Sequence, residues 1–123
     1  MHQVLVIDDH RQIREMASRL LAGRYDVTLR ADALDIVADF ERLHQPVVVL
    51  DISLPTLDGF AAARLLKRRH PEAKIVFFSS DPNPRTVQEA FALGGSAYVV
   101  KTRAVAELIP AIEAAIDDSV PPL

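Results

Sequence analysis

Acidic side chains follow directly on two short apolar runs of this 123-residue chain. Asp8 and Asp9 come after residues 4–7 (VLVI), and Asp51 comes after residues 47–50 (VVVL). Carboxylates that meet repel one another, by on the order of 4 kcal/mol per pair at about 4 Å and an effective dielectric of about 20. A divalent cation relieves this repulsion, and oxygen ligands without histidine or cysteine suit a hard ion, Mg²⁺ or Mn²⁺. The acids therefore predict a cation site, provided that the fold brings them together.

Two further apolar runs end in groups that complement the acids. Residues 74–78 (KIVFF) lead to Ser79, and residues 97–100 (AYVV) lead to Lys101. An ionised Asp51 beside a cation and a lysine is poised to attack phosphorus, because both positive charges neutralise the oxygens of the transferring group. The Ser79 hydroxyl could then donate a hydrogen bond to a phosphoryl oxygen. The chemistry predicted for this set is phosphoryl transfer to an aspartate.

Each of these residues also has an ordinary structural explanation when it is taken alone. An aspartate between a strand and a helix is commonly an N-cap, and Asp58, before Gly59, is expected to be one. Lys101 alone would be a surface lysine, and Ser79 alone a loop hydroxyl. The combination differs, because four strand ends independently place complementary groups at one edge of a sheet. We therefore predict a functional site there.

The remainder of the chain supplies the elements that would bring these strand ends together. Short β-branched runs alternate with stretches of helical periodicity, and the predicted strands cover residues 4–7, 25–29, 47–50, 74–78 and 97–100. Runs that are apolar on both faces favour a parallel sheet covered by helices on both sides, which is an α/β architecture. In such sheets ligands bind beyond the carboxyl ends of the strands.

The helical stretches predict which side chains face the sheet. Asn83 should cap the fourth helix with Pro84 at its first position, and Gly23 should end the first helix. Apolar positions mark the inner faces, with Leu34, Val37, Ala38 and Phe40 in the second helix, Val87, Ala90 and Phe91 in the fourth, and Val105, Leu108, Ile109, Ile112 and Ile116 in the fifth. Pro110 lies inside the last pattern, where it predicts a kink or a local break.

Composition argues against several other classes of function. Fourteen Lys and Arg residues against 17 Asp and Glu give a net charge of −3, so no basic nucleic-acid-binding face is expected. The lack of cysteine excludes disulfides and thiolate chemistry and fits a reducing compartment. No apolar run approaches the roughly 18 residues of a membrane span, and no signal peptide is recognisable. The four glycines form no phosphate-binding loop motif. We expect a cytoplasmic domain that binds neither membrane nor nucleic acid.

The same residues carry a resemblance to the receiver domains of two-component response regulators. The DDH at residues 8–10 is similar to the acidic pair of that family, and DISLPTLDG at residues 51–59 resembles its phosphoacceptor segment. The serines at 79–80 match the hydroxyl position, and YVVK at 98–101 matches the aromatic residue and lysine of the fifth strand. The match covers nearly the whole chain. The sequences of these segments most resemble those of NarL/FixJ-type receivers, which carry a helix-turn-helix output domain.

The resemblance implies a fold and a function. The fold would be five βα units in a flavodoxin-like, doubly wound five-stranded parallel sheet with strand order 2-1-3-4-5. The receiver would span residues 1–118, and residues 119–123 would be a tail or the start of a linker. Asp51 would accept a phosphoryl group from a sensor histidine kinase or a phosphotransfer protein, with Mg²⁺ required.

The resemblance also implies a role for each site residue. Metal contacts would come from Asp9, Asp51 and the backbone carbonyl of Ser53, while Asp8 would act largely through water. Lys101 would pair with Asp51 before the transfer and with the phosphoryl group after it. The domain would catalyse its own phosphorylation and slow dephosphorylation, and would not be a turnover enzyme in the usual sense.

Ser79 and Tyr98 would form the switch. Ser79 would move toward the phosphoryl oxygen and vacate space into which Tyr98 turns. This movement would reshape the surface of the fourth helix, fifth strand and fifth helix, where a downstream protein or a second copy of the chain would dock. Ser53 and Asp81 occupy positions that tune dephosphorylation in the family. Thr102 stands where many members have a cis proline, so the bond before it is expected to be trans.

Three functions remain open at this point. The chain could be a stand-alone phosphorylation switch, or the receiver half of a transcription regulator. The third is a metal-dependent phosphatase with an aspartyl-phosphate intermediate. Against this last function, Ser53 stands two residues after Asp51, where a second acid would be needed as a general acid.

Overall fold

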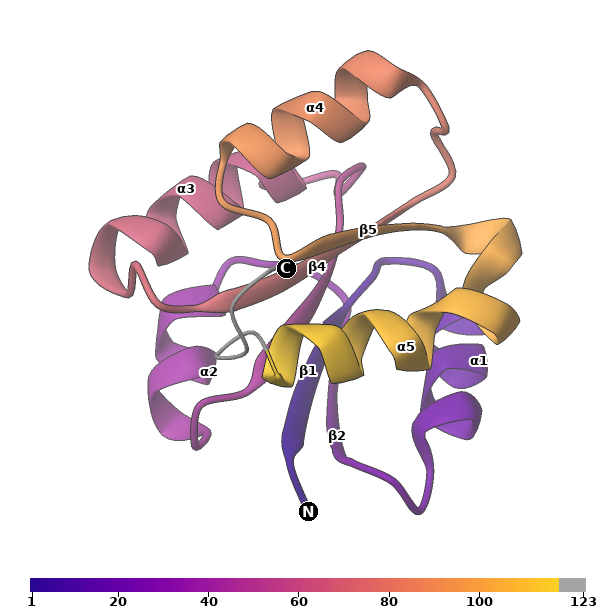
Figure 1. The fold of residues 1–123 in the computed structure, drawn as a ribbon. Coiled ribbons are helices and arrows are strands. Elements are labelled where there is room, and N and C mark those ends of the chain that lie inside the picture. The colour runs from indigo at the N-terminus through magenta and orange to yellow at the C-terminus, as the bar shows by residue number, and fades with distance from the viewer. Residues whose placement is uncertain (118–123) are drawn as a thin grey trace.

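The computed structural model describes residues 1–117, which form one five-stranded sheet with helices on both faces (Figure 1). The elements, in chain order, are β1 (Gln3–Ile7), α1 (Arg11–Leu21), β2 (Asp26–Arg30), α2 (Ile36–Arg42), β3 (Val47–Asp51), α3 (Gly59–Arg69), β4 (Lys74–Ser79), α4 (Pro84–Ala92), β5 (Ala97–Val100), a 3₁₀ turn (Lys101–Arg103) and α5 (Ala104–Ile116). The strands pair in parallel in the order β2-β1-β3-β4-β5. This confirms the doubly wound α/β fold. The predicted tail, residues 119–123, lies outside the described residues.

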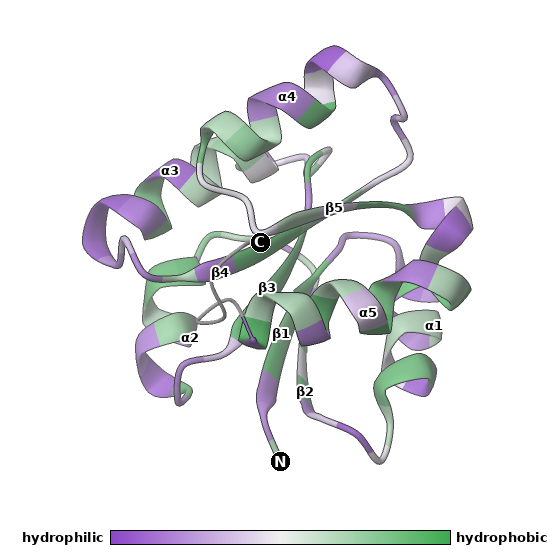
Figure 2. Ribbon diagram, viewed as in Figure 1, coloured by the Kyte–Doolittle hydropathy of each residue, from purple (hydrophilic) through white to green (hydrophobic). Residues whose placement is uncertain are grey.

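The central strands are buried on both faces, which explains their unbroken apolar sequences. Val4 and Val6 of β1 pack with α1 and α5 on one side, whereas Leu5 and Ile7 pack with α2, α3 and α4 on the other. Figure 2 shows the hydrophobic colouring concentrated along β1 and β3 in the middle of the sheet. Each buried apolar side chain contributes about 1.5–3 kcal/mol, so these strands anchor the fold. Their rigid carboxyl ends then hold whatever side chains follow them.

The capping predictions are confirmed at two helices beside the strand ends. Asp58 accepts a hydrogen bond of 2.9 Å from the Ala61 backbone N–H at the start of α3. Asn83 accepts one of 2.9 Å from the Arg85 backbone N–H, with Pro84 at the first position of α4. Each cap stabilises its helix by about 1 kcal/mol. Gly23, with φ of +79°, follows the end of α1, as predicted.

Four predicted inward positions are wrong. Leu34 precedes α2 and is exposed, and Ala38 within α2 is exposed as well. Phe91 in α4 is 49% exposed and Val105 in α5 is 79% exposed. The buried positions next to the last two are filled by Ala90 and Ala104. One residue along a helix turns the side chain by about 100°, so a small residue at the sheet sends its larger neighbour toward solvent.

The predicted break at Pro110 is absent. Helix α5 runs from Ala104 through Pro110 to Ile116 as one element, and Figure 1 shows a continuous coil. Proline leaves the carbonyl of Ala106, four residues earlier, without its helical donor. Both residues are exposed, so water can satisfy that carbonyl.

Within the part of the chain that the structure describes, no helix has the length and apolar character needed to cross a bilayer.

Candidate functional site

The register of the sheet brings the predicted groups together at the carboxyl ends of the strands. Ile7 is aligned with Leu50, Leu50 with Phe77, and Phe77 with Tyr98, so the residues that follow them meet at one edge. The Lys101 ammonium lies 2.8 Å from Oδ2 of Asp8. It also lies 3.3 Å from Oδ2 of Asp51.

The metal-ligating side chains at this edge lie close together. One ligand atom each from Asp8, Asp9, His10 and Asp51 falls within 4.8 Å of the others. Asp8 is held from two directions, because its Oδ1 accepts a hydrogen bond of 2.9 Å from the His10 backbone N–H and its carbonyl accepts one of 2.8 Å from Arg14. The edge therefore presents a preorganised cluster of carboxylates.

Burial makes the negative charge of this cluster costly. Asp8 and Asp51 are buried, and the Lys101 side chain is only 9% exposed. Burial is the main cause that raises the pKa of Asp51, and the nearby Asp8 raises it further. Lys101 and the Ser53 backbone N–H, which donates to Asp51 Oδ1 at 3.1 Å, oppose this increase. One ammonium thus pairs with two carboxylates, and Asp9 adds a third beside them, which leaves an excess of negative charge.

Three buried carboxylate oxygens of this cluster have few partners: Asp8 Oδ2, Asp9 Oδ1 and Asp51 Oδ2. Asp8 Oδ2 and Asp51 Oδ2 share the one ammonium of Lys101, at 2.8 and 3.3 Å, and Asp9 Oδ1 lies 3.3 Å from His10 Nδ1, so each oxygen has room for a further positive partner. Carboxylate oxygens are the ligands that Mg²⁺ prefers. The residues present therefore fit a divalent cation.

The loop between β4 and α4 is tied to the site through Asp81. Its backbone N–H donates to Ser79 Oγ at 3.0 Å, and its carbonyl accepts from the Tyr98 hydroxyl at 2.5 Å. Its carboxylate accepts from the Asn83 N–H at 2.9 Å and from Thr86 Oγ1 at 2.8 Å. These hydrogen bonds lower the pKa of Asp81. Tyr98 therefore contacts the loop rather than the acids.

A hollow of about 270 Å³ opens over the site. Besides Asp51 and Lys101, its lining consists of His10, Ser53, Ser79, Ser80 and Asp81. The hollow thus joins the acidic cluster to the predicted hydroxyl and to the β4–α4 loop. An anion that enters would meet the Lys101 ammonium and three serine residues.

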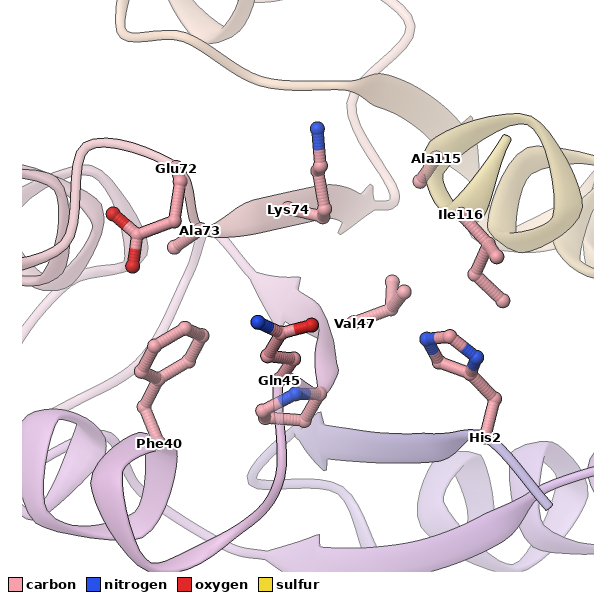
Figure 3. A pocket seen from close by; sticks show the side chains of 10 residues that line it. His2, Phe40, Gln45, Val47, Glu72, Ala73, Lys74, Ala115 and Ile116 are labelled. Atoms are coloured by element: carbon pink, nitrogen blue, oxygen red, sulfur yellow. The ribbon is translucent and has the colours of Figure 1, made fainter. Parts of the chain in front are cut away.

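Another hollow, of about 290 Å³, lies at the opposite edge of the sheet and carries no comparable cluster (Figure 3). Figure 3 shows Phe40, Gln45, Val47 and Ile116 around it. Glu72 is its one acidic lining residue. The described residues there mix apolar side chains with His2, Gln45, Glu72 and Lys74, and they form no cluster of carboxylates like the one around Asp51.

Most of the predicted site residues meet as expected, and two additional residues contribute. His10 and Arg14 were not predicted as site residues, yet His10 lines the hollow and Arg14 holds Asp8. The position of His10 directly after the acidic pair was a usable signal. Nothing in the spacing of Arg14 pointed to the Asp8 carbonyl. The peptide bond before Thr102 is trans, as expected, since the described residues contain no cis bond.

Fold and site together define a class, a doubly wound α/β protein whose parallel sheet ends in aspartates facing a lysine. The profile of the family described as "Response regulator receiver domain" matches residues 4–113. The chain belongs to this family. It is thus a signalling domain, homologous to two-component response regulators, and the phosphatase alternative is not favoured.

Curated relatives agree with this assignment. The chain is 31% identical over 114 residues to the transcriptional regulatory protein DegU of Brevibacillus brevis, with 90% of this chain and 48% of DegU covered. It is 34% identical over 118 residues to the response regulator GacA of Pseudomonas viridiflava, with 91% of this chain and 54% of GacA covered. The chain therefore spans about half the length of these relatives.

Solved structures share the fold. A two-component response regulator of the LuxR family from Aurantimonas sp. SI85-9A1 superposes with a TM-score of 0.86 at 32% identity, covering 94% of this chain and 85% of that chain. The chemotaxis protein CheY4 of Vibrio cholerae gives a TM-score of 0.85 at 24% identity, covering 94% of this chain and 98% of that chain. The second likeness concerns the fold alone.

Proposed function

We propose that Asp51 is the phosphoacceptor of a phosphorylation switch. Its carboxylate would attack the phosphorus of a phosphohistidine on a sensor histidine kinase or phosphotransfer protein, forming an O–P bond as the N–P bond breaks. The observation that carries the proposal is the position of Asp51 Oδ2, which is buried and lies 3.3 Å from the Lys101 ammonium. Such an oxygen is available as a nucleophile beside a positive charge.

The proposed cation is Mg²⁺, or Mn²⁺ in its place. Asp9, Asp51 and the backbone carbonyl of Ser53 would hold it, and Asp8 would act largely through water. When bound, the ion neutralises charge on the phosphoryl oxygens during transfer. The three buried carboxylate oxygens of the cluster, which have a single ammonium between them, support this assignment.

Lys101 and Ser79 would receive the transferred group. Lys101 would exchange part of its pairing with the aspartates for a phosphoryl oxygen. Ser79 Oγ would leave the Asp81 N–H, from which it accepts at 3.0 Å, and donate to the phosphoryl group. The phosphoryl group brings about −1.5 to −2 charges and three strong acceptors to these residues.

The movement of Ser79 would release Tyr98. In the present state the Tyr98 hydroxyl donates to the carbonyl of Asp81 in the loop that Ser79 also contacts. If Ser79 leaves, the loop changes and Tyr98 can turn into the vacated space. The proposed readout is the α4-β5-α5 surface, where a downstream protein or a second copy of the chain would bind. The phosphoryl group shifts this equilibrium only through contacts that differ between the two states.

Self-catalysed loss of the phosphoryl group would limit the lifetime of the signal. Ser53 and Asp81 both line the hollow above Asp51, through which an attacking water must pass. We propose that these two residues tune the rate of dephosphorylation. The domain would act on its own aspartate and not on a stream of small substrates.

The relatives suggest the larger context. DegU is named a transcriptional regulatory protein, and this chain covers about half of it. We propose that residues 1–118 act as the receiver of such a regulator in the cytoplasm, and that any contact with DNA is made by another domain. Residues 119–123 would be a tail or the start of a linker.

The proposal is tested by incubating the protein with acetyl phosphate and Mg²⁺ and measuring its intact mass. One added phosphoryl group is expected for the wild type, and none for Asp51→Ala or for the wild type with EDTA. An Asp58→Ala variant serves as control, since Asp58 caps α3 and should leave Asp51 reactive. Equal phosphorylation of the wild type and Asp51→Ala would overturn the assignment.

A further inference from the structure

We propose that His10 is an additional ligand of the cation site and extends its selectivity from Mg²⁺ toward borderline transition ions such as Co²⁺ and Ni²⁺. The inference rests on the proposed cation site at Asp9 and Asp51. It adds to that site a nitrogen donor that hard-ion chemistry does not require. The His10 side chain is one of the four that cluster there.

The distances fit ligands that share one ion. His10 Nδ1 lies 3.4 Å from Asp8 Oδ1 and 3.3 Å from Asp9 Oδ1. Two adjacent ligand atoms of an octahedral ion, each about 2.1 Å from the metal, are about 3.0 Å apart. A small rotation of the imidazole would therefore complete the coordination. All four ligand atoms already lie within 4.8 Å of one another.

The buried acids supply an independent reason to expect a cation. Asp8 Oδ2 and Asp51 Oδ2 belong to fully buried side chains and share the Lys101 ammonium, and Asp9 Oδ1 is a buried atom of a side chain that is 29% exposed. The single ammonium of Lys101 leaves most of their charge uncompensated. Such oxygens gain from any ion that reaches them.

The backbone of His10 is attached to the acidic cluster, whereas its imidazole is free to turn toward it. Its N–H donates to Asp8 Oδ1 at 2.9 Å, so the residue is attached to the cluster that it would complete. His10 is the N-cap of α1, yet its side chain makes no capping hydrogen bond. The imidazole is 66% exposed and lines the hollow over Asp51, so an ion arriving from solvent can reach it without unfolding anything.

The identity of the donor determines which ions benefit. A neutral imidazole binds Co²⁺ and Ni²⁺ far better than Mg²⁺, which prefers oxygen and keeps its waters. Removing His10 should therefore leave Mg²⁺ binding unchanged. It should weaken the binding of the transition ions.

The experiment compares the full chain with His10→Ala, Asp9→Asn and His70→Ala by calorimetric titration with Mg²⁺, Co²⁺ and Ni²⁺. His70 is a matched control, because its imidazole also contacts two carboxylates, at 3.0 Å (Glu41) and 3.4 Å (Glu72), away from the site. We expect His10→Ala to weaken Co²⁺ and Ni²⁺ about tenfold and Mg²⁺ by less than about twofold. Pulsed electron paramagnetic resonance of the Mn²⁺ complex should show nitrogen coupling in the wild type and none in His10→Ala.

The outcomes separate this inference from the proposed function. Asp9→Asn should lose the binding of all three ions, and retained Mg²⁺ binding by that variant would contradict the cation site itself. Unchanged Co²⁺ affinity and nitrogen coupling in His10→Ala would overturn the role of His10 alone. If His70→Ala loses Co²⁺ binding and His10→Ala keeps it, the ion binds at His70, Glu41 and Glu72. That result would also overturn the role of His10.

Discussion

The ammonium of Lys101 lies closer to Asp8, at 2.8 Å, than to the proposed phosphoacceptor, at 3.3 Å. The lysine therefore bridges two buried aspartates before any phosphoryl group arrives. Sharing the ammonium in this way keeps the nucleophilic oxygen of Asp51 beside a positive charge that also serves Asp8. The arrangement is one of paired opposite charges in a site with little access to water.

Replacing Lys101 by alanine should destabilise the metal-free protein. The change leaves two buried carboxylates facing each other without a counter-charge, at a cost of roughly 3 kcal/mol. Mg²⁺ should then raise the melting temperature more in the variant than in the wild type, because the ion supplies the missing positive charge. Arg103→Ala is the control, since it breaks an exposed ion pair with Glu107 that contributes little. Equal melting temperatures for Lys101→Ala and the wild type without metal would contradict the account.

Asp51→Asn should stabilise the metal-free protein at neutral pH. The pKa of Asp51 is raised above its ordinary value of 3.8, so the folded state holds this proton more tightly than the unfolded state does. Stability from this group is complete below pH 3.8 and is lost as the pH rises through the raised pKa. Urea unfolding at pH 7 should give a higher midpoint for the variant, and the difference should shrink on acidification.

The exposed aspartate Asp35 provides the matched control for this series. Asp35→Asn removes the same charge from the surface and should shift the midpoint little at either pH. Addition of Mg²⁺ should reverse the order of Asp51→Asn and the wild type, because only the wild type offers an ionised carboxylate at that position. If Asp51→Asn is no more stable than the wild type at pH 7, the buried charge of Asp51 does not destabilise the fold.

Gly59→Ala should damage both stability and phosphorylation. A Cβ at this position would run into the backbone of Asp51 and Ile52, and the Gly59 N–H already donates to the Ile52 carbonyl at 2.8 Å. Overpacking of this kind costs about 1–3 kcal/mol. Because the strain falls on the phosphoacceptor itself, the rate of phosphorylation by acetyl phosphate should fall as well. Gly23→Ala, strained at φ of +79° but with open space around it, should lose stability without that loss of rate.

Asp81→Ala should shorten the lifetime of the phosphorylated state. The carboxylate holds Asn83 and Thr86 and so keeps the β4–α4 loop closed beside the hollow. A looser loop admits water to the aspartyl phosphate, and we expect the decay to accelerate about twofold or more. Thr86→Val removes one of these hydrogen bonds and should have a smaller effect in the same direction. An unchanged half-life in Asp81→Ala would remove Asp81 from the rate-tuning role.

The fold was predictable because its determinants are local and repeated. Val47 to Leu50 is apolar at every position, a pattern typical of a strand that is covered on both faces. Asp58 and Asn83 are typical N-cap residues and so indicate where the next helices begin. The side of a helix that faces the sheet was less predictable. Whether Ala104 or Val105 points inward depends on how the helix is rotated against the strands, and hydrophobicity alone favoured the larger residue.

The members of the site and the Lys101–Asp51 pair were predictable, but the closer pairing of Lys101 with Asp8 was not. Parallel strands bring the side chains that follow their carboxyl ends to one edge, so Asp8, Asp51 and Lys101 had to meet. The Lys101 ammonium lies only a few tenths of an ångström closer to Asp8 than to Asp51, and a sequence pattern cannot predict so small a difference. The hydrogen bonds from Arg14 and from the Tyr98 hydroxyl depend on long side chains crossing loops, which no spacing rule anticipates.

The most direct measurement of the central claim identifies the residue that carries the phosphoryl group. After incubation with acetyl phosphate and Mg²⁺, borohydride reduces an aspartyl phosphate to homoserine, which peptide mass spectrometry locates. The account predicts homoserine at position 51 and nowhere else, and none when EDTA replaces Mg²⁺. Homoserine at another aspartate, or label at position 51 that is indifferent to Mg²⁺, would contradict it.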